Sequence, residues 1–201
     1  MLSIRIRHAV KHNSKYLVLC FVLLSLFSCS SSAPPLRYYL LHDVSHTASG
    51  TQTFERQVVL KSLILPEYLK QAGLVYQLGP AELHISQSHF WSESIDVGIS
   101  RLIRKDIAND GILLTASINM SSPTQEATEL SLFIDDFLPT WEGNVILAGR
   151  YEFKSNNGKT LLQHFHYTQA LNDDGFEHSV LAMRSVIGSL SEDISASLKA
   201  M

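Results

Sequence analysis

One cysteine, directly after a short apolar run, limits how this 201-residue chain can fold. The first 15 residues hold four basic side chains and no acidic one, and residues 16–27 are almost wholly apolar. A helix that spans a bilayer needs about 20 apolar residues, and this run has only 12. A basic start and a short apolar run are typical of an export signal. We therefore expect the signal to end just before Cys29 and a folded domain to follow it.

The residues around Cys29 resemble the lipobox of bacterial lipoproteins, with Leu26 three positions before the cysteine and the small Ser28 next to it. The resemblance implies that the Cys29 thiol receives a diacylglycerol, that residues 1–28 are removed as a lipoprotein signal peptide, and that the new amine is acylated, for example with palmitate. More than one acyl chain anchors a protein stably, since each buried CH₂ contributes about 0.8 kcal/mol. The alternative is that the apolar run remains as an uncleaved anchor helix.

The residue directly after Cys29 indicates which of the two membranes would carry the lipoprotein. Lipoproteins kept in the inner membrane commonly carry Asp after the lipidated cysteine, whereas this chain has Ser30. By that resemblance we expect a lipid-anchored protein on the periplasmic face of the outer membrane.

The processed chain is acidic and without disulfides. Residues 29–201 hold 12 basic and 19 acidic side chains, a net charge of −7. This balance disfavours binding to nucleic acid or to anionic head groups. The chain has two cysteines, and Cys20 leaves with the signal while Cys29 is acylated. A domain of this size must then be held together by its apolar core alone.

The pattern after the cysteine predicts a short tether over residues 29–36 and a single domain over residues 37–201. Period-two patterning and turn residues predict strands at residues 37–41, 58–65, 74–78, 82–86, 113–120, 130–138, 144–154 and 160–171. We expect loops at residues 42–53 and 121–123, a helical turn at residues 66–69, and hairpins at Gly79-Pro80 and at Asn156-Asn157-Gly158.

Two segments have apolar residues at helical spacing. The first runs from Ile95 to Ile107, with Ser92 as its expected N-cap and Gly111 just beyond its end. The second begins near Phe176, with Asp173 or Asp174 as its expected cap, and continues to Leu198. Strands around two amphipathic helices predict an α/β (α+β) fold. Its mixed β-sheet would carry both helices and end in an antiparallel C-terminal meander.

The histidines were considered as metal ligands. His164 and His166 share one face of a predicted strand, and His178 or Asp174 would have to complete the site from the last helix. Their strand face is otherwise polar, so a solvated surface is the preferred interpretation. His84 and His89 have no carboxylate at ligand spacing. We predict no metal and no cofactor.

Two acidic pairs were considered for catalysis. Asp135 and Asp136 are neighbours in a predicted strand and should point to opposite faces, while Asp173-Asp174 sits at an expected helix cap. No nucleophile motif accompanies them, so no catalytic residue is predicted. The aromatic pairs Tyr38-Tyr39 and Phe90-Trp91 are interpreted as core packing, with a partner surface as the alternative.

Short motifs along the chain resemble the family of ABC-type transport auxiliary lipoproteins, the PqiC-like group. The similarity covers residues 37–198 and lies in Tyr38-Tyr39-Leu40-Leu41, Leu65-Pro66-Glu67-Tyr68-Leu69, Leu74-Val75-Tyr76, Trp91-Ser92-Glu93-Ser94, Arg101-Leu102, Gly149-Arg150-Tyr151 and the closing helix from Phe176 to Ile194. Ser92 and Ser94 stand where the family usually has Ala and Pro, a difference that affects only the start of the helix.

The resemblance implies a non-enzymatic periplasmic lipoprotein that works with an MCE-domain protein and an inner-membrane partner to move lipids, phospholipids among them, between the two membranes. Family members have an α/β sandwich domain and can assemble into rings. Only Cys29 is carried over as a functional residue, as the lipidation site, and the surface that binds the partner is not identified. The alternative is an envelope hydrolase whose site the sequence does not reveal. A third is a carrier with its own lipid cavity, although a sandwich of this size is expected to be solid.

Overall fold

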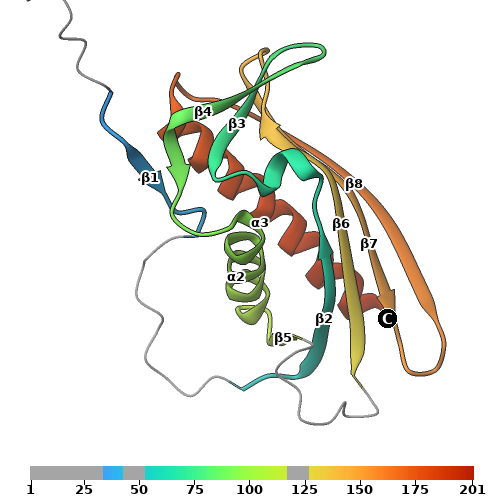
Figure 1. Ribbon diagram of the computed structural model, residues 1–201. Helices are drawn as coiled ribbons and strands as arrows, with labels where there is room; N and C mark the ends of the chain where they lie inside the picture. Colours follow the sequence, from blue (N-terminus) through green and yellow to red (C-terminus); the bar gives the residue numbers. More distant parts are fainter. Residues whose placement is uncertain (1–33, 43–52, 117–126) are drawn as a thin grey trace, which may run out of the picture. The chain divides into compact units, whose positions relative to one another are not determined.

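Two β-sheets and two long helices make up the computed structural model, which describes residues 34–42, 53–116 and 127–201 (Figure 1). Leu36–Met201 is one compact unit. Cys29, the predicted signal peptide, most of the predicted tether, most of the loop after His42 and the predicted loop at residues 121–123 lie outside the described residues. So does the end of the strand predicted at residues 113–120. Within the described part of the chain, no helix is both long and apolar enough to cross a membrane.

The smaller sheet has three strands in the order β1-β4-β3. Its central strand pairs in parallel with one neighbour and antiparallel with the other. The strands are β1 (Arg37–Tyr39), β3 (Gly73–Gly79) and β4 (Glu82–Trp91). The last two form the hairpin predicted at Gly79-Pro80.

The larger sheet has five strands in the order β5-β2-β6-β7-β8. β2 pairs in parallel with both its neighbours, and β6, β7 and β8 form the predicted antiparallel meander. The strands are β2 (Arg56–Ile64), β5 (Ile112–Ala116), β6 (Thr128–Pro139), β7 (Asn144–Lys154) and β8 (Thr160–Ala170).

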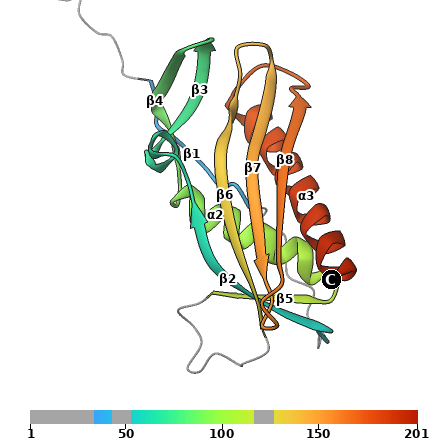
Figure 2. The same ribbon diagram turned by 90° about the vertical axis from the view of Figure 1, so that its right-hand side faces the viewer.

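The helices form one layer behind the meander (Figure 2). α3 (Phe176–Ala200) packs across β6, β7 and β8, and α2 (Ile95–Ala108) packs against α3 and β5. A 3₁₀ turn, η1 (Glu67–Lys70), follows β2 where the sequence predicts a helical turn. The α+β fold of mixed sheets with two helices is confirmed. The strands, however, divide between two mixed sheets, where the sequence led us to expect one.

The core lies between the helices and the inner faces of the strands. Alternation along β7 buries Val145, Leu147, Gly149, Tyr151 and Phe153, as predicted. These side chains meet the apolar stripe of α3. That stripe is buried at Val180, Met183, Ile187, Leu190, Ile194 and Leu198, and the half-buried Phe176 packs against it at the start of the helix.

Both helix caps predicted from the sequence are wrong. β4 continues to Trp91, so α2 begins later and its N-cap is Ser94, whereas the Ser92 hydroxyl donates to the carbonyl oxygen of Tyr39 at 2.9 Å. The N-cap of α3 is Gly175, with φ +116°, a conformation that favours glycine. Neither N-cap makes a side-chain capping hydrogen bond.

A β-bulge corrects the interpretation of the Asp135-Asp136 pair. Ile134 pairs with Gly149 and Asp136 with Ala148, so Asp135 is an extra residue in β6. The bulge cancels the alternation, and both carboxylates are exposed on the sheet face away from the helices. They do not share a site: Asp135 lies 3.8 Å from Arg150, while Asp136 accepts a hydrogen bond from the Tyr68 hydroxyl at 3.2 Å.

Candidate functional site

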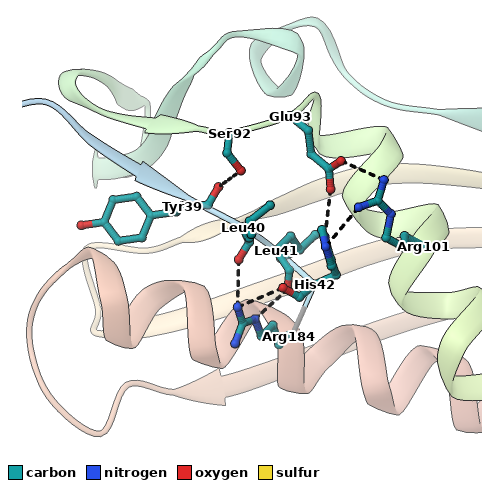
Figure 3. A network of polar contacts seen from close by, with 8 residues as sticks. All are labelled: Tyr39, Leu40, Leu41, His42, Ser92, Glu93, Arg101 and Arg184. Carbon is teal, nitrogen blue, oxygen red and sulfur yellow. Dashed lines mark hydrogen bonds and ion pairs between the residues drawn. The ribbon is translucent and has the colours of Figure 1, made fainter. Parts of the chain in front are cut away.

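A network of polar contacts fixes the segment that leaves β1 (Figure 3). In this short segment Leu41 lies in the core, only 1% exposed, while Leu40 and His42 are half-buried. Its backbone carbonyls must therefore find donors, because a buried carbonyl without a partner is costly. The donors are Ser92, directly after β4, and Arg184 of α3, which are distant in the sequence.

Arg184 is the main donor. From α3 its Nε donates to the carbonyl oxygen of Leu41 at 2.7 Å, and its Nη2 donates to those of Leu40 at 3.0 Å and His42 at 3.2 Å (Figure 3). One planar guanidinium thus holds three successive carbonyl groups, an arrangement that a lysine ammonium would not reproduce. Ser92 completes the series at the carbonyl of Tyr39 through its backbone N–H and its hydroxyl, both at 2.9 Å.

A second cluster fixes the side chain of His42. Its Nδ1 lies 2.9 Å from Oε1 of Glu93, and neither of these buried atoms makes a hydrogen bond within the described residues. Arg101 donates from Nη1 to Nε2 of His42 at 3.1 Å and lies 3.2 Å from the other Glu93 oxygen through Nη2. Since a guanidinium only donates, Nε2 of His42 accepts the hydrogen bond from Arg101.

Aromatic rings extend the attachment of β1 to the start of α3. Tyr39 stacks on His89 at 5.8 Å between ring centroids, and His89 stacks on Phe176 at 3.8 Å. Nδ1 of His89 lies 3.0 Å from the Ser88 hydroxyl. Burial, with the nearby Arg37 guanidinium second, lowers the pKa of His89 below its ordinary value of 6.5, so the neutral ring is favoured.

The aromatic pairs predicted as core packing divide between two faces of the small sheet. Tyr39 and Trp91 face inward and pack in or against the core. Tyr38 and Phe90, which pair across β1 and β4, face outward, with Tyr38 64% exposed. Exposed Leu83 and Ile85 belong to the same outer face. Core packing is therefore confirmed for Tyr39 and Trp91, while the outward Tyr38 and Phe90 leave the partner surface as a prediction.

The remaining candidates are not brought together. His164 and His166 lie on the exposed face of β8, and no group of three potential ligands that could hold a metal occurs in the described residues. Asp173 binds the backbone N–H of Asp174 at 2.8 Å. Burial and the neighbouring Asp136 raise the pKa of Tyr68 well above its usual range, so its hydroxyl remains a hydrogen-bond donor.

The sequence interpretation missed Arg184 and His42. Arg184 is one polar residue on a long helix, and the carbonyls it serves are more than 140 positions away. The motifs that resemble the family did include Glu93 and Arg101. Their spacing, eight positions apart across the start of a helix, was the signal in the sequence that pointed to this cluster. The site can fix β1 in place, and β1 is the first element after the predicted tether.

This fold and this site define a class of protein, a two-sheet α+β domain whose first strand is held by polar contacts. We call these contacts the polar lock; they are made by His42, Ser92, Glu93, Arg101 and Arg184. The sequence matches the family of ABC-type transport auxiliary lipoprotein components over residues 38–195, and the chain belongs to this family. The match includes β1, the polar lock and most of α3.

Individual relatives are similar over almost the same range. The intermembrane transport lipoprotein PqiC of Escherichia coli (strain K12) is 24% identical over 176 residues, which are 87% of this chain and 92% of that protein. PqiC of Shigella flexneri shows the same values.

Two solved structures share the fold. A crystal structure of an uncharacterized protein has a TM-score of 0.68 and 18% identity, and it covers 82% of this chain and 99% of that one. Protein XCC0632 from Xanthomonas campestris has a TM-score of 0.57 and 9% identity, with 81% and 93% covered.

Proposed function

We propose that this protein is a lipoprotein on the periplasmic face of the outer membrane, where it serves as an accessory, partner-binding component of an MCE-type phospholipid transport system. The observation that carries the proposal is the family match across residues 38–195, together with relatives named as intermembrane transport lipoproteins. Its role is to bind a partner, and it catalyses no reaction.

The polar lock supports this role mechanically. In the proposal the lipid on Cys29 carries any load from the membrane through a short tether into β1. The guanidinium of Arg184 and the hydroxyl of Ser92 transmit that load to α3 and β4. A three-residue strand alone would give little resistance, because β1 is an edge strand with only one hydrogen-bonded neighbour.

The partner would be an MCE-domain protein that reaches the outer membrane from an inner-membrane complex. The outward face of the small sheet, with Tyr38, Phe90, Leu83 and Ile85, offers the exposed apolar and aromatic surface that such docking uses. It lies on β1 and β4, and β1 follows the expected anchor closely in the chain. A ring of several copies is compatible with the same role.

Crosslinking in cells tests the partnership. We expect reversible crosslinking of the native lipoprotein, followed by purification, to recover an MCE-domain protein. A Tyr38→Ser variant should reduce its yield, whereas His166→Ser on the exposed face of β8 should not. Recovery of unrelated proteins alone would contradict the proposal.

Fractionation tests the anchor. Replacement of Cys29 by Ala removes the thiol that would be acylated, so we expect the protein to leave the outer-membrane fraction. A Cys20→Ala variant is the matched control and should fractionate like the wild type, because that cysteine would be removed with the signal. If the Cys29→Ala protein remained in the outer membrane, the proposed attachment would be wrong.

A further inference from the structure

Two strand connections at one end of the domain expose apolar side chains. Trp141, in the turn between β6 and β7, is 53% exposed, and Leu78, near the end of β3, is 48% exposed. Exposed Pro80 and Ala81 follow Leu78 in the β3–β4 turn. We call these four residues the apolar tip. The two connections lie side by side in both views of the ribbon (Figures 1 and 2), and β3 also contacts β6.

The turn at the other end of the large sheet has a different character. β7 runs away from the apolar tip, and its turn into β8, over residues 155–159, consists of polar side chains and one glycine. An indole has an apolar body and one N–H donor, a combination that suits the boundary between water and lipid. The composition of the apolar tip therefore suits a bilayer surface.

The turn that carries Trp141 is ordered by its own hydrogen bonds. The backbone N–H of Thr140 donates to the carbonyl oxygen of Asn144 at 2.6 Å, and that of Gly143 donates to the carbonyl oxygen of Thr140 at 3.2 Å. Gly143 has φ +78°, a conformation that favours glycine. The indole is thus presented at the tip without a rearrangement, so a contact there costs little ordering.

The first strand is directed toward the same end of the domain. β1 pairs in parallel with β4, with Arg37 opposite His89, so the start of β1 points toward the end where β4 begins. β4 begins seven residues before His89, a distance of about 23 Å along a strand. Cys29 precedes Arg37 by eight residues, which span at most about 28 Å when extended. A bilayer that holds a lipid on Cys29 is therefore within reach of the apolar tip.

The charges beside the apolar tip distinguish between kinds of bilayer. Exposed Glu82 and Glu142 directly follow Ala81 and Trp141 in the chain. Exposed Asp173 is close to them, because the N–H of Leu171 donates to the carbonyl oxygen of Gly143 at 2.9 Å. These carboxylates would lie at the level of the lipid head groups. An anionic head-group layer would repel them, whereas a zwitterionic layer carries no net charge.

We propose that the apolar tip rests in the head-group interface of the bilayer that anchors the protein, among zwitterionic lipids. The inference rests on the proposed function, because the lipid on Cys29 is what keeps the tip beside a bilayer. A contact of four side chains is weak alone, but the anchor gives it a high effective concentration. The contact would fix the orientation of the domain on the membrane, which a lipid on a short tether does not do.

Quenching of tryptophan fluorescence by brominated lipid tests the contact on the native lipidated protein. The chain has two tryptophans, and Trp91 is only 9% exposed, so the difference between the wild type and Trp141→Phe isolates the emission of Trp141. The vesicles consist of phosphatidylcholine with bromine in the upper part of one acyl chain. We expect the Trp141 emission to fall at least about twofold, since interfacial apolar groups lie about 5–10 Å deep. The Trp91 emission that remains in Trp141→Phe should change little.

Leu78→Asp and Leu162→Asp form a matched pair. The two leucines are 48% and 52% exposed, but Leu162 lies on β8 opposite Glu152, near the end of the large sheet that is away from the apolar tip. Leu78→Asp should remove most of the quenching of Trp141, because it places a charge in the interface, whereas Leu162→Asp should leave the quenching unchanged. Thermal melting identifies the folded variants.

A change of lipid tests the zwitterionic preference. Replacing part of the brominated phosphatidylcholine by brominated phosphatidylglycerol should reduce the quenching of Trp141 at low salt, and added salt should restore it because it screens the repulsion. Equal quenching in the two kinds of vesicle at low salt would overturn the preference for zwitterionic lipid.

The other outcomes separate this inference from the proposed function. If the protein is lipidated and bound to vesicles but Trp141 is not quenched, the tip contact is wrong and the proposed anchor stands. Equal losses of quenching in Leu78→Asp and Leu162→Asp would also overturn the contact. Protection of Trp141 from aqueous iodide without quenching by lipid would assign the apolar tip to a second copy of the chain. A native protein that carries no lipid and remains in solution would overturn both the contact and the anchor.

Discussion

Arg184 shows how a single residue can join the first strand to the last helix. It serves three carbonyl groups over residues 40–42, and these hydrogen bonds are partly buried. Losing a charged donor to buried carbonyls costs more than losing an exposed ion pair, because the acceptors are left without partners.

Replacement of Arg184 by Met should therefore lower the free energy of unfolding by about 2 kcal/mol. Urea denaturation followed by circular dichroism measures the change. Arg150→Met is the matched control. Arg150 lies over the Phe133 ring and 3.8 Å from Asp135 on an exposed face, and its loss should cost under about 1 kcal/mol. Equal effects of the two substitutions would contradict the role given to Arg184.

His89 gives the fold a pH dependence of known sign. Its pKa is lowered in the folded state, so the unfolded chain binds more protons below the ordinary value of 6.5. The contribution to stability is complete above that pH and is lost as the pH falls through the folded pKa.

A His89→Phe variant should keep the stacking on Phe176 and lose this part of the pH dependence. The difference in unfolding free energy between variant and wild type, measured from pH 7.5 to 5, should change in favour of the variant as the pH falls. His166→Phe, at an exposed position on β8, should run parallel to the wild type. A constant difference for His89→Phe would disprove the assignment.

At the scale of elements, the β6–β7 pair depends on a close approach at Gly149. A Cβ atom there would lie 2.1 Å from the carbonyl oxygen of Phe133 and 2.9 Å from the Phe165 ring. Phe133 belongs to the strand backbone that carries the bulge, so it cannot move aside easily.

Gly149→Ala should thus destabilise the protein by about 3 kcal/mol, since it overpacks a buried backbone contact. Gly188→Ala is the control, because a Cβ in the middle of α3 meets nothing within 4 Å and should stabilise the helix by about 0.5–1 kcal/mol. Thermal melting of the two variants measures both effects. A neutral Gly149→Ala variant would show that the strands can separate.

Elements were predictable where local patterning governs them. β7 was predicted with its full bounds, and the buried stripe of α3 follows from helical spacing. The expected Ser92 cap of α2 was wrong because the length of β4 is set by pairing with β1, which lies outside any local window. The interpretation of Asp135 was wrong for a similar reason. An extra residue in β6 can be recognised only from the register of β6 with β7.

At the scale of the whole molecule, the candidate site could be predicted only in part. Trp91-Ser92-Glu93-Ser94 was visible as a motif, and it supplies Ser92 and Glu93 to the lock. The partners of these two residues come from β1, the segment after it and α2, and only the fold brings them together. The division into two sheets was also beyond the sequence pattern, since the pattern within a strand does not say which strands it pairs with.

In the proposed function, a lipid on Cys29 anchors the domain to the membrane, and Arg184 joins the segment after the first strand to the last helix. Mass spectrometry of the N-terminal peptide of the protein purified from its native membrane tests this most directly. The account predicts that the mature chain begins at Cys29 with a diacylglyceryl thioether and an acylated amine. An unmodified N-terminus, or a chain that begins elsewhere, would contradict it.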